Sequence, residues 1–241
     1  MVDVDFDGLR RDLQPGGPGP SAQWCAGCAK LLDADGAAIS VRADAAELDV
    51  SELVWFSDQV SADLDDLQFT LGEGPGLDAV RRGSLNLITD TGRAPHPQWP
   101  QFTAEAQAMG VGAVFAFPLQ LGALRVGTLT CHRRGAHEPG QQTVDDALAL
   151  CDDLTLFLLR RPPPDTADRS PARSCLWGPE AWHRVEVHQA TGMLSVQLEV
   201  TLAAALMRLR AHAYAIGRPI TDVARDILAR RLVLPRDRAR P

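Results

Sequence analysis

The chain has 241 residues, 45% of them hydrophobic, and a formal net charge of −7. This composition excludes a disordered chain and leaves room for one large domain or two ordinary ones. The longest mostly apolar stretch, residues 112–124, is too short to cross a bilayer, and the first residues are acidic where a signal peptide would be basic. We therefore expect a cytoplasmic protein with no membrane segment.

Charge is divided unevenly along the chain. Residues 1–165 hold 12 basic and 24 acidic side chains, whereas residues 166–241 hold 12 basic and 7 acidic ones. Lys30 is the one lysine, so arginine supplies nearly all the positive charge, and its position in the chain is more informative than its number. An acidic body followed by a basic segment favours an anionic partner for that segment.

Two breaks rich in proline divide the sequence. The segment QPGGPGP (residues 14–20) ends a flexible N-terminal tail, predicted over residues 1–20, because proline removes backbone donors and glycine costs entropy. Four prolines between residues 160 and 174 predict an extended linker over 161–175. Folded units are thus expected over 21–160 and 176–234, followed by a basic tail over 235–241.

Between the two breaks, helix and strand patterns alternate. Ser21 is expected to cap a helix that reaches Leu32, and Gly122 with Ala123 to form a hairpin turn. Strands are predicted over residues 37–43, 53–57, 84–89, 114–121 and 124–131, and helices over 61–68, 75–82, 99–109 and 143–159. These elements predict an α+β unit, in which an antiparallel sheet is flanked by helices.

After the linker, the pattern is helical only. Helices are predicted over residues 180–198 and 202–216, the second closed by Gly217, and a third is expected to start from a cap at Thr221. Such a small all-α bundle of three helices is marginally stable alone, and dimerisation or a long preceding helix would help it.

Several motifs resemble known families. LGEGPGLDAV (71–80), a short strand ending in Asp90, WPQF (99–102) and GVGAVFAFPL with GTLTC (110–131) resemble the GAF domains of actinobacterial regulators. QATGML (189–194), the pattern AL-x-x-LR-x-x-A (205–213) and DVA (222–224) resemble the ANTAR domain, an RNA-binding three-helix module. Together they imply a GAF and ANTAR domain-containing transcription antitermination regulator, with a sensory and dimerisation domain over 21–160 and an RNA-binding domain over 176–234.

The chain departs from these families at three positions. Gly76 stands where the GAF turn often has cysteine, Thr191 where ANTAR commonly has lysine, and Leu206 where an aromatic residue is usual. Thr191 removes one cation from the expected RNA face. A protein-interaction module with a decayed RNA face therefore remains an alternative.

The resemblance and the basic charge together predict a set of RNA contacts. Arginines neutralise phosphates and form forked hydrogen bonds to exposed bases, and a tyrosine ring can stack on a base. The predicted set is Arg184, Thr191, Arg208, Arg210, His212, Tyr214 and Arg218. On charge alone, a solvated helix face is the favoured interpretation, and the resemblance shifts the balance to a nucleic-acid or partner contact. The hypothesis requires that the arginines are not tied up by carboxylates of the same chain.

Four aromatic residues are candidates for a small-molecule pocket, since related domains often bind ligands between the sheet and the helices. They are Trp99, Phe102, Phe115 and Phe117. Core packing is the alternative, and we favour it for Phe115 and Phe117.

The motif WCAGC places Cys25 and Cys28 at the spacing of a thioredoxin-type redox pair. A proline and glycine spacer precedes it instead of a strand, so packing inside the first helix is the favoured interpretation. Cys131, Cys151 and Cys175 form no second close pair, so no zinc site is predicted. No catalytic arrangement, metal or cofactor is expected.

The leading hypothesis is thus a non-catalytic, signal-responsive homodimer that binds hairpin loops in nascent transcripts. A DNA-binding transcription regulator could use the same three helices, because a helix in a major groove also needs arginines. A redox protein is a less favoured alternative.

Overall fold

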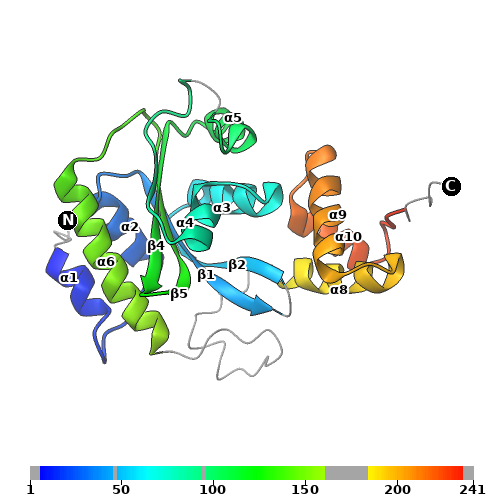
Figure 1. The fold of residues 1–241 in the computed structure, drawn as a ribbon, viewed down its shortest axis with the longest axis horizontal. Helices are drawn as coiled ribbons and strands as arrows, with labels where there is room; N and C mark the ends of the chain where they lie inside the picture. Colours follow the sequence, from blue (N-terminus) through cyan, green and yellow to red (C-terminus); the bar gives the residue numbers. More distant parts are fainter. Residues whose placement is uncertain (1–5, 46–47, 94–95, 161–183, 236–241) are drawn as a thin grey trace.

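A computed structural model describes residues 6–45, 48–93, 96–160 and 184–235. A central sheet lies between two layers of helices, and further helices lie beyond one of these layers (Figure 1). The predicted linker over 161–175 and residues 236–241 of the predicted tail lie outside the described residues. We call residues 6–160 the sheet unit and residues 184–235 the helical unit.

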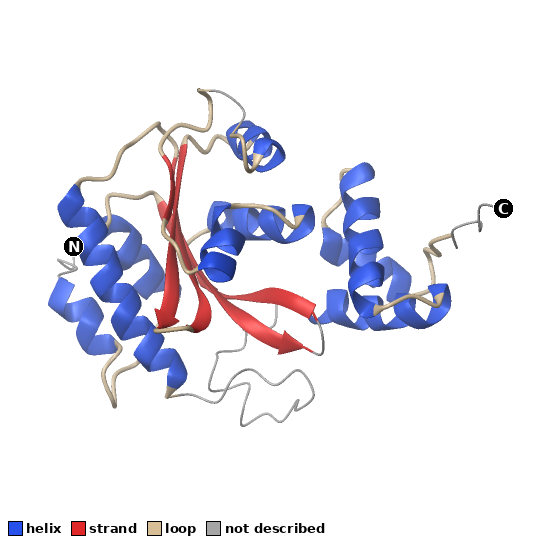
Figure 2. Ribbon diagram, viewed as in Figure 1, coloured by secondary structure: helices blue, strands red, loops and turns tan. Residues whose placement is uncertain are grey.

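The sheet has five strands in the order β2-β1-β5-β4-β3, and every neighbouring pair is antiparallel (Figure 2). The strands are β1 (Gly36–Ala45), β2 (Leu48–Phe56), β3 (Asn86–Ile88), β4 (Ala113–Leu121) and β5 (Leu124–Arg133). Gly122, at φ +59°, turns the chain between β4 and β5, where Leu121 pairs with Leu124. The antiparallel sheet predicted from the sequence is confirmed.

One face of the sheet is covered by α1 (Phe6–Asp12), α2 (Ala22–Leu31) and α6 (Gln141–Leu159). As predicted, Ser21 caps α2, and its side chain accepts a hydrogen bond from the Trp24 backbone N–H at 3.1 Å. Successive strand residues point to opposite faces, so alternate apolar side chains enter one core with those of α2 and α6. This apolar core includes Ile39, Phe115, Phe117, Leu129 and Leu150.

The first helix corrects the prediction of a flexible tail over residues 1–20. Residues 6–12 form α1, which places Leu9 and the following Leu13 in the apolar core. The Trp24 indole N–H donates to the Leu9 carbonyl at 3.1 Å, and Arg10 pairs with Asp153 of α6. Fully burying a leucine contributes about 1.5–3 kcal/mol, which offsets part of the entropy lost when this short segment is ordered.

The other face carries α3 (Gln59–Leu71), α4 (Pro75–Arg82) and α5 (Pro100–Ala108). Between α3 and α4 the chain turns through Gly72, at φ +71°, and Gly74, at φ +145°. A Cβ atom at Gly74 would lie 2.5 Å from Cγ of Gln68, so glycine is required there on grounds of space as well as backbone angle. Pro75 then opens α4, as the sequence predicts.

The helical unit consists of α8 (Val185–Leu198), α9 (Leu202–Ala215) and α10 (Ile220–Leu228). Leu194, Leu209, Val223 and Ile227 are buried together at its centre. Gly217, at φ +62°, follows α9 as expected. The predicted cap at Thr221 is wrong, because α10 already begins at Ile220 and the capping position is taken by the preceding proline. Residues 180–183 of the first predicted helix lie outside the described residues.

No single described helix has the length and apolar composition of a membrane span. The pair α8 and α9 meets that measure only when taken together, across a bend of 109°.

Candidate functional site

The helical unit packs against the sheet unit through side chains that are mostly charged, polar or aromatic. Figure 1 shows α9 beside α3 and α5, with α8 next to the β1–β2 hairpin. We call this region the inter-unit contact. From the sheet unit it includes Ser51, Glu52, Asp65, Asp66, Phe69, Gln101 and Glu105, and from the helical unit Arg184, His188, Arg210 and Tyr214.

Arg184 lies at the centre of the contact and is fully buried, at 0% exposure. Its Nη2 donates to Asp65 and Asp66, both at 2.6 Å, its Nε donates to Asp66 at 3.1 Å, and its Nη1 donates to the Ser51 carbonyl at 3.0 Å. Burial alone would lower the pKa of Arg184, but the charges of the two aspartates outweigh burial and raise it. A buried cation with these partners holds the start of α8 on the sheet unit.

Phe69 of α3 joins the buried cluster of the helical unit, and two guanidinium groups lie over its ring. The central carbon of Arg184 is 4.3 Å from the ring centroid, and that of Arg210 is 4.4 Å from it. Cation–π contacts at these distances contribute about 0.5–2 kcal/mol, depending on desolvation. The ring of Phe69 therefore bridges the two units.

Arg210 differs from Arg184 in having no carboxylate partner within the described part of the chain. Its Nε is buried and lacks any hydrogen-bond partner among the described residues. Burial, followed by the nearby charges of Arg184 and Arg81, lowers the pKa of Arg210 to about 10. The Arg210 guanidinium therefore packs on the ring of Phe69, while its Nε–H donates no hydrogen bond within the described structure.

Two further pairs complete the contact. His188 of α8 is bonded through Nε2 to Oε1 of Glu52, a carboxylate that is 1% exposed. The Tyr214 hydroxyl of α9 donates to Glu105 of α5 at 3.2 Å and accepts from the Gln101 side chain. Polar side chains of both α8 and α9 therefore form hydrogen bonds with the sheet unit.

Helix α3 faces two ways. One carboxylate oxygen of Asp65 accepts a hydrogen bond from Ser40 on β1, while the other accepts from Arg184. One helical turn later, the side chain of Gln68 accepts from the Gly76 backbone N–H at 2.7 Å, while Phe69 turns outward to the helical unit. The same helix therefore contacts both the sheet and the inter-unit contact.

The sheet face beneath α3 is unusually polar, a feature that the sequence interpretation overlooked. Ser40, Thr128, Thr130 and His132 are all buried there and alternate with apolar residues that point to the other face. The alternation T-x-T-x-H in residues 128–132 is the sequence signal that could have revealed it. We call these four residues the polar sheet face.

Around Gly76, this polar layer is closely packed by the protein's own side chains. A Cβ atom at Gly76 would lie 3.0 Å from both the Gln68 side-chain oxygen and the Thr130 hydroxyl. That hydroxyl and Nδ1 of His132 are buried without a hydrogen-bond partner in the ranges that the structure describes. Such groups cost free energy until a partner is supplied.

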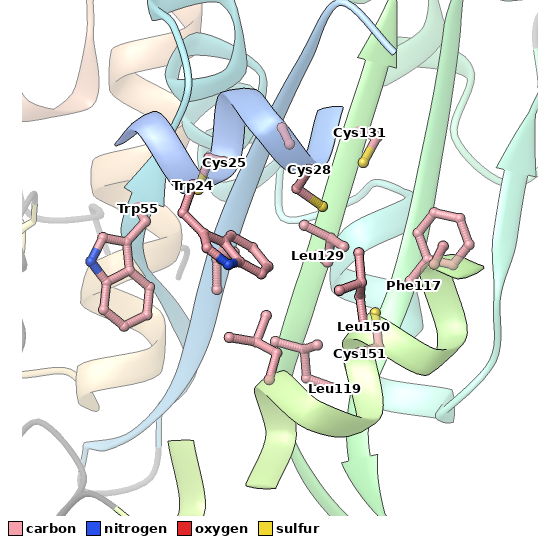
Figure 3. Packing of buried hydrophobic residues seen from close by; sticks show 14 of the residues in the cluster. Trp24, Cys25, Cys28, Trp55, Phe117, Leu119, Leu129, Cys131, Leu150 and Cys151 are labelled. Carbon is pink, nitrogen blue, oxygen red and sulfur yellow. The ribbon is translucent and has the colours of Figure 1, made fainter. Parts of the chain in front are cut away.

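The four predicted pocket aromatics do not line one pocket. Trp99 and Phe102 lie on the α3 side with Leu64 and Val114, whereas Phe115 and Phe117 lie in the apolar core on the opposite face. Figure 3 shows Phe117 in this core. The prediction of a common pocket is corrected for this pair, since β4 points residues 115 and 117 to the face covered by α2 and α6.

Trp99 and Phe102 are themselves well packed. Trp99 is 3% exposed, stacks on His96 with ring centroids 4.5 Å apart, and donates from its indole nitrogen to Asp78 at 3.1 Å. Glu73 accepts hydrogen bonds from the backbone N–H groups of Gln101 and Phe102, at 3.2 and 3.1 Å. This carboxylate therefore caps the start of α5, a role that the sequence did not reveal.

Two residues of the predicted RNA set are buried. Arg184 is held in the inter-unit contact, and Thr191 is 1% exposed, with its hydroxyl donating to the Val187 carbonyl at 2.7 Å. In this arrangement neither residue reaches a surface, so both are withdrawn from the set. Arg218 pairs with Asp226 at 2.8 Å. The RNA-binding hypothesis requires arginines that are not paired with carboxylates of the same chain, and neither Arg184 nor Arg218 meets this requirement.

Apart from Arg218, which follows α9, the remaining candidates lie on two flanks of this helix. Residues two apart on a helix do not face each other, whereas residues four apart share a side. Arg210 and Tyr214 form the flank that faces α3 and α5. Arg208 and His212 form the other flank, and both are half-buried. We refer to these as the inner flank and the outer flank of α9.

The cysteines of the described chain are packing residues. Cys25, Cys28, Cys131 and Cys151 are free and buried, and their side chains meet in the apolar core (Figure 3). Burial raises the pKa of all four thiols, and that of Cys131 to about 12. Such thiols stay neutral, which argues against the redox interpretation of Cys25 and Cys28. Over the described residues, no group of three or more His, Cys, Asp or Glu side chains could hold a metal ion.

No protein-family model matches the chain, and a search of curated proteins finds no similar one. Similar solved structures include the second GAF domain of DevS from Mycobacterium smegmatis, with a TM-score of 0.41 and 17% identity, covering 65% of this chain and 95% of that one.

Two others are GAF domains of phosphoenolpyruvate-protein phosphotransferases, each covering 66% of this chain and 96% of its own. The one from Acinetobacter has a TM-score of 0.49 and 13% identity, and the one from Coxiella burnetii has 0.49 and 16%. The antiparallel sheet with flanking helices described above is the arrangement expected for a GAF-like unit.

Proposed function

We propose that this protein is a non-catalytic, signal-responsive regulator whose helical unit binds structured RNA in transcription antitermination. The observation that supports this most directly is the lack of a carboxylate partner for Arg210 in the described structure, where its Nε–H also has no hydrogen-bond partner. Once α9 is uncovered, this guanidinium would bind a phosphate or a base edge without first breaking an ion pair.

The structure narrows the residues that this proposal uses. Arg208, Arg210, His212 and Tyr214 lie along α9, and Arg218 follows its end. The ion pair of Arg218 with Asp226 is at the surface, where such pairs contribute about 0–1 kcal/mol, so RNA phosphates can replace the carboxylate. An arginine and tyrosine surface of this kind fits hairpin loops, whose bases are unstacked and open to side chains.

In this proposal the GAF-like sheet unit receives the signal. The polar sheet face offers two unsatisfied buried groups, on Thr130 and His132, that a small polar ligand would pair with. Trp99 and Phe102 pack on the same side of the sheet. The protein would act in the cytoplasm as a homodimer, in which two helical units raise the effective concentration for paired hairpins.

The proposal is tested by measuring the affinity of the full chain for an RNA hairpin, over a range of salt concentrations and in competition with duplex DNA of the same sequence. Arg210→Ala is expected to weaken hairpin binding about tenfold or more. Arg134→Ala removes the same charge from an exposed position in the sheet unit and is expected to change affinity little. Absence of RNA binding at low salt contradicts the proposal, and equal competition by duplex DNA favours the DNA-binding alternative.

A protein-interaction module is the second candidate function. It is favoured by the inner flank of α9, because Arg210 and Tyr214 already contact protein groups on α3 and α5. Burial of Thr191, where ANTAR commonly has lysine, points the same way. This candidate predicts that the full chain and its variants bind no RNA at low salt.

A further inference from the structure

We infer that the inter-unit contact is autoinhibitory: the surface formed by α3 and α5 competes with RNA for the inner flank of α9. This inference rests on the proposed RNA binding and adds how that binding is controlled.

The inner flank is occupied in the described arrangement. The guanidinium of Arg210 lies 4.4 Å from the centre of the Phe69 ring, and its Nε is buried. The Tyr214 hydroxyl is bonded to Glu105 and Gln101. A phosphate at Arg210 would need the space that Phe69 now fills, and a base bonded to the Tyr214 hydroxyl would need the hydrogen bonds of Glu105 and Gln101, although 42% of Tyr214 is exposed. RNA and the sheet unit therefore compete for Arg210 and for the Tyr214 hydroxyl.

The competing surface offers the same chemistry as RNA. A nucleotide presents negatively charged oxygens and a flat ring on which guanidinium groups stack. Asp65, Asp66 and Glu105 supply the charged oxygens, and Phe69 supplies the ring. Arg184 and Arg210 both lie over that ring. This similarity explains why a basic segment predicted to meet an anionic polymer instead lies against the acidic sheet unit.

Arg184 makes the interactions that hold the helical unit on the sheet unit. It bonds to three separate groups of the sheet unit, at distances of 2.6–3.1 Å, and is completely shielded from water. Because a buried charge that loses its partners is strongly unfavourable, loss of one aspartate would weaken the hold on Arg184, and loss of both would drive Arg184 into solvent and separate α9 from α3. If only about 1% of molecules are separated, the apparent RNA affinity is about 100-fold weaker than that of the free helical unit.

The test compares the full chain with Asp66→Asn and with the control Asp63→Asn. Both variants remove one carboxylate from α3, but Asp63 is exposed and, among the residues that the structure describes, its side chain bonds only to Gln59 of the same helix. Asp66→Asn leaves Asp65 to pair with Arg184, which protects folding. A second variant, Glu105→Gln, weakens the Tyr214 contact without touching a buried charge.

We expect Asp66→Asn to bind an RNA hairpin about tenfold more tightly than the parent chain, and Glu105→Gln to bind a few-fold more tightly. Small-angle X-ray scattering is expected to show a larger radius of gyration for Asp66→Asn and no change for Asp63→Asn. The control also measures how much affinity is gained merely by removing a negative charge.

One result would overturn the autoinhibitory competition, and another would overturn the proposed RNA binding. If Asp66→Asn expands but binds the hairpin no more tightly than Asp63→Asn, the competition is overturned while RNA binding stands. If neither the expanded variant nor the parent chain binds RNA at low salt, the proposed function itself fails.

Discussion

The apolar core and the inter-unit contact are stabilised in different ways. The core is built from aliphatic, aromatic and sulfur-containing side chains that are shielded from water and need no specific partner. The contact depends on a few directed interactions, with Arg184, Phe69 and Tyr214 at their centres. The free energy of an apolar core changes with the area exposed to water, whereas a buried ion pair is lost as a whole when one partner moves away. The contact is therefore the part of the molecule best suited to change state, and the four predictions below test this difference.

The largest effect is expected in the core. Phe117→Ala removes a ring that is 2% exposed, and we expect the free energy of unfolding in urea to fall by about 3–5 kcal/mol. Leu121→Ala, at the 54% exposed end of the same strand, is the control and should cost less than about 0.5 kcal/mol. A loss below about 1 kcal/mol for Phe117→Ala would show that this face of the sheet is not a stabilising core.

Arg184→Met tests the contact in the same way. The variant leaves Asp65 and Asp66 without their cation, so we expect the packing of the helical unit on the sheet unit to weaken by about 3 kcal/mol. Calorimetry should then show a separate, earlier transition, while the transition of the sheet unit stays in place. Arg231→Met, at a mostly exposed ion pair with Asp226, is the control. A single unchanged transition for Arg184→Met would mean that the contact does not depend on this charge.

Alkaline pH should weaken the core through its thiols. Burial raises the pKa of Cys28 in the folded state, so the stabilising contribution of the neutral thiol is complete below the unfolded pKa of about 8.5 and is lost as pH rises above it. The free energy of unfolding should fall by about 1.4 kcal/mol per pH unit for each such thiol. Urea denaturation of the parent and of Cys28→Ala between pH 8 and 10 measures how much the Cys28 thiol contributes to the pH dependence of the free energy of unfolding. Equal slopes for the two proteins would contradict the buried, neutral state.

The smallest effect is expected at Tyr214, the single tyrosine of the chain. Burial, the hydrogen bond to Glu105 and the charges of Glu105 and Glu73 raise its pKa. Glu105→Gln should therefore bring the pKa of the phenol back toward its ordinary value and weaken the contact by about 0.5–1 kcal/mol. Absorbance titration of the one phenol measures this shift directly, and Gln59→Ala on α3 provides an unrelated surface control. An unchanged pKa would place Tyr214 outside the contact in solution.

The secondary structure could be predicted because its signals are local. Ser21 caps a helix, Gly122 turns a hairpin and Gly217 follows a helix, each through preferences of the residues themselves. The first helix is not predicted because only Phe6, Leu9 and Leu13 mark it, directly before a segment rich in proline and glycine. Its stability comes from packing on α2 and α6, which a local pattern does not show.

The candidate site could be predicted only in part, because its residues are distant in sequence. Arg184 and its partner Asp65 are 119 positions apart, so charge counts could not show that they pair. Trp99 and Phe115 lie on opposite faces of the sheet because alternate residues of β4 point toward α3 or away from it. Which residues point toward α3 is defined only once the sheet is assembled. The basic character of the helical unit was visible in the sequence, whereas its acidic partner within the same chain was not.

The two hydrogen bonds of Asp65 couple the sheet to the helical unit. Its two oxygens serve different neighbours, Ser40 of the sheet and Arg184 of the helical unit, so a molecule that took over the bond from Ser40 would alter the hold on Arg184. Under the proposed function, coupling of this kind is reciprocal: the factor by which a ligand in the sheet unit would change RNA affinity is the factor by which RNA would change the affinity for that ligand. A transcript would then act as an effector of the proposed sensor, as well as its target.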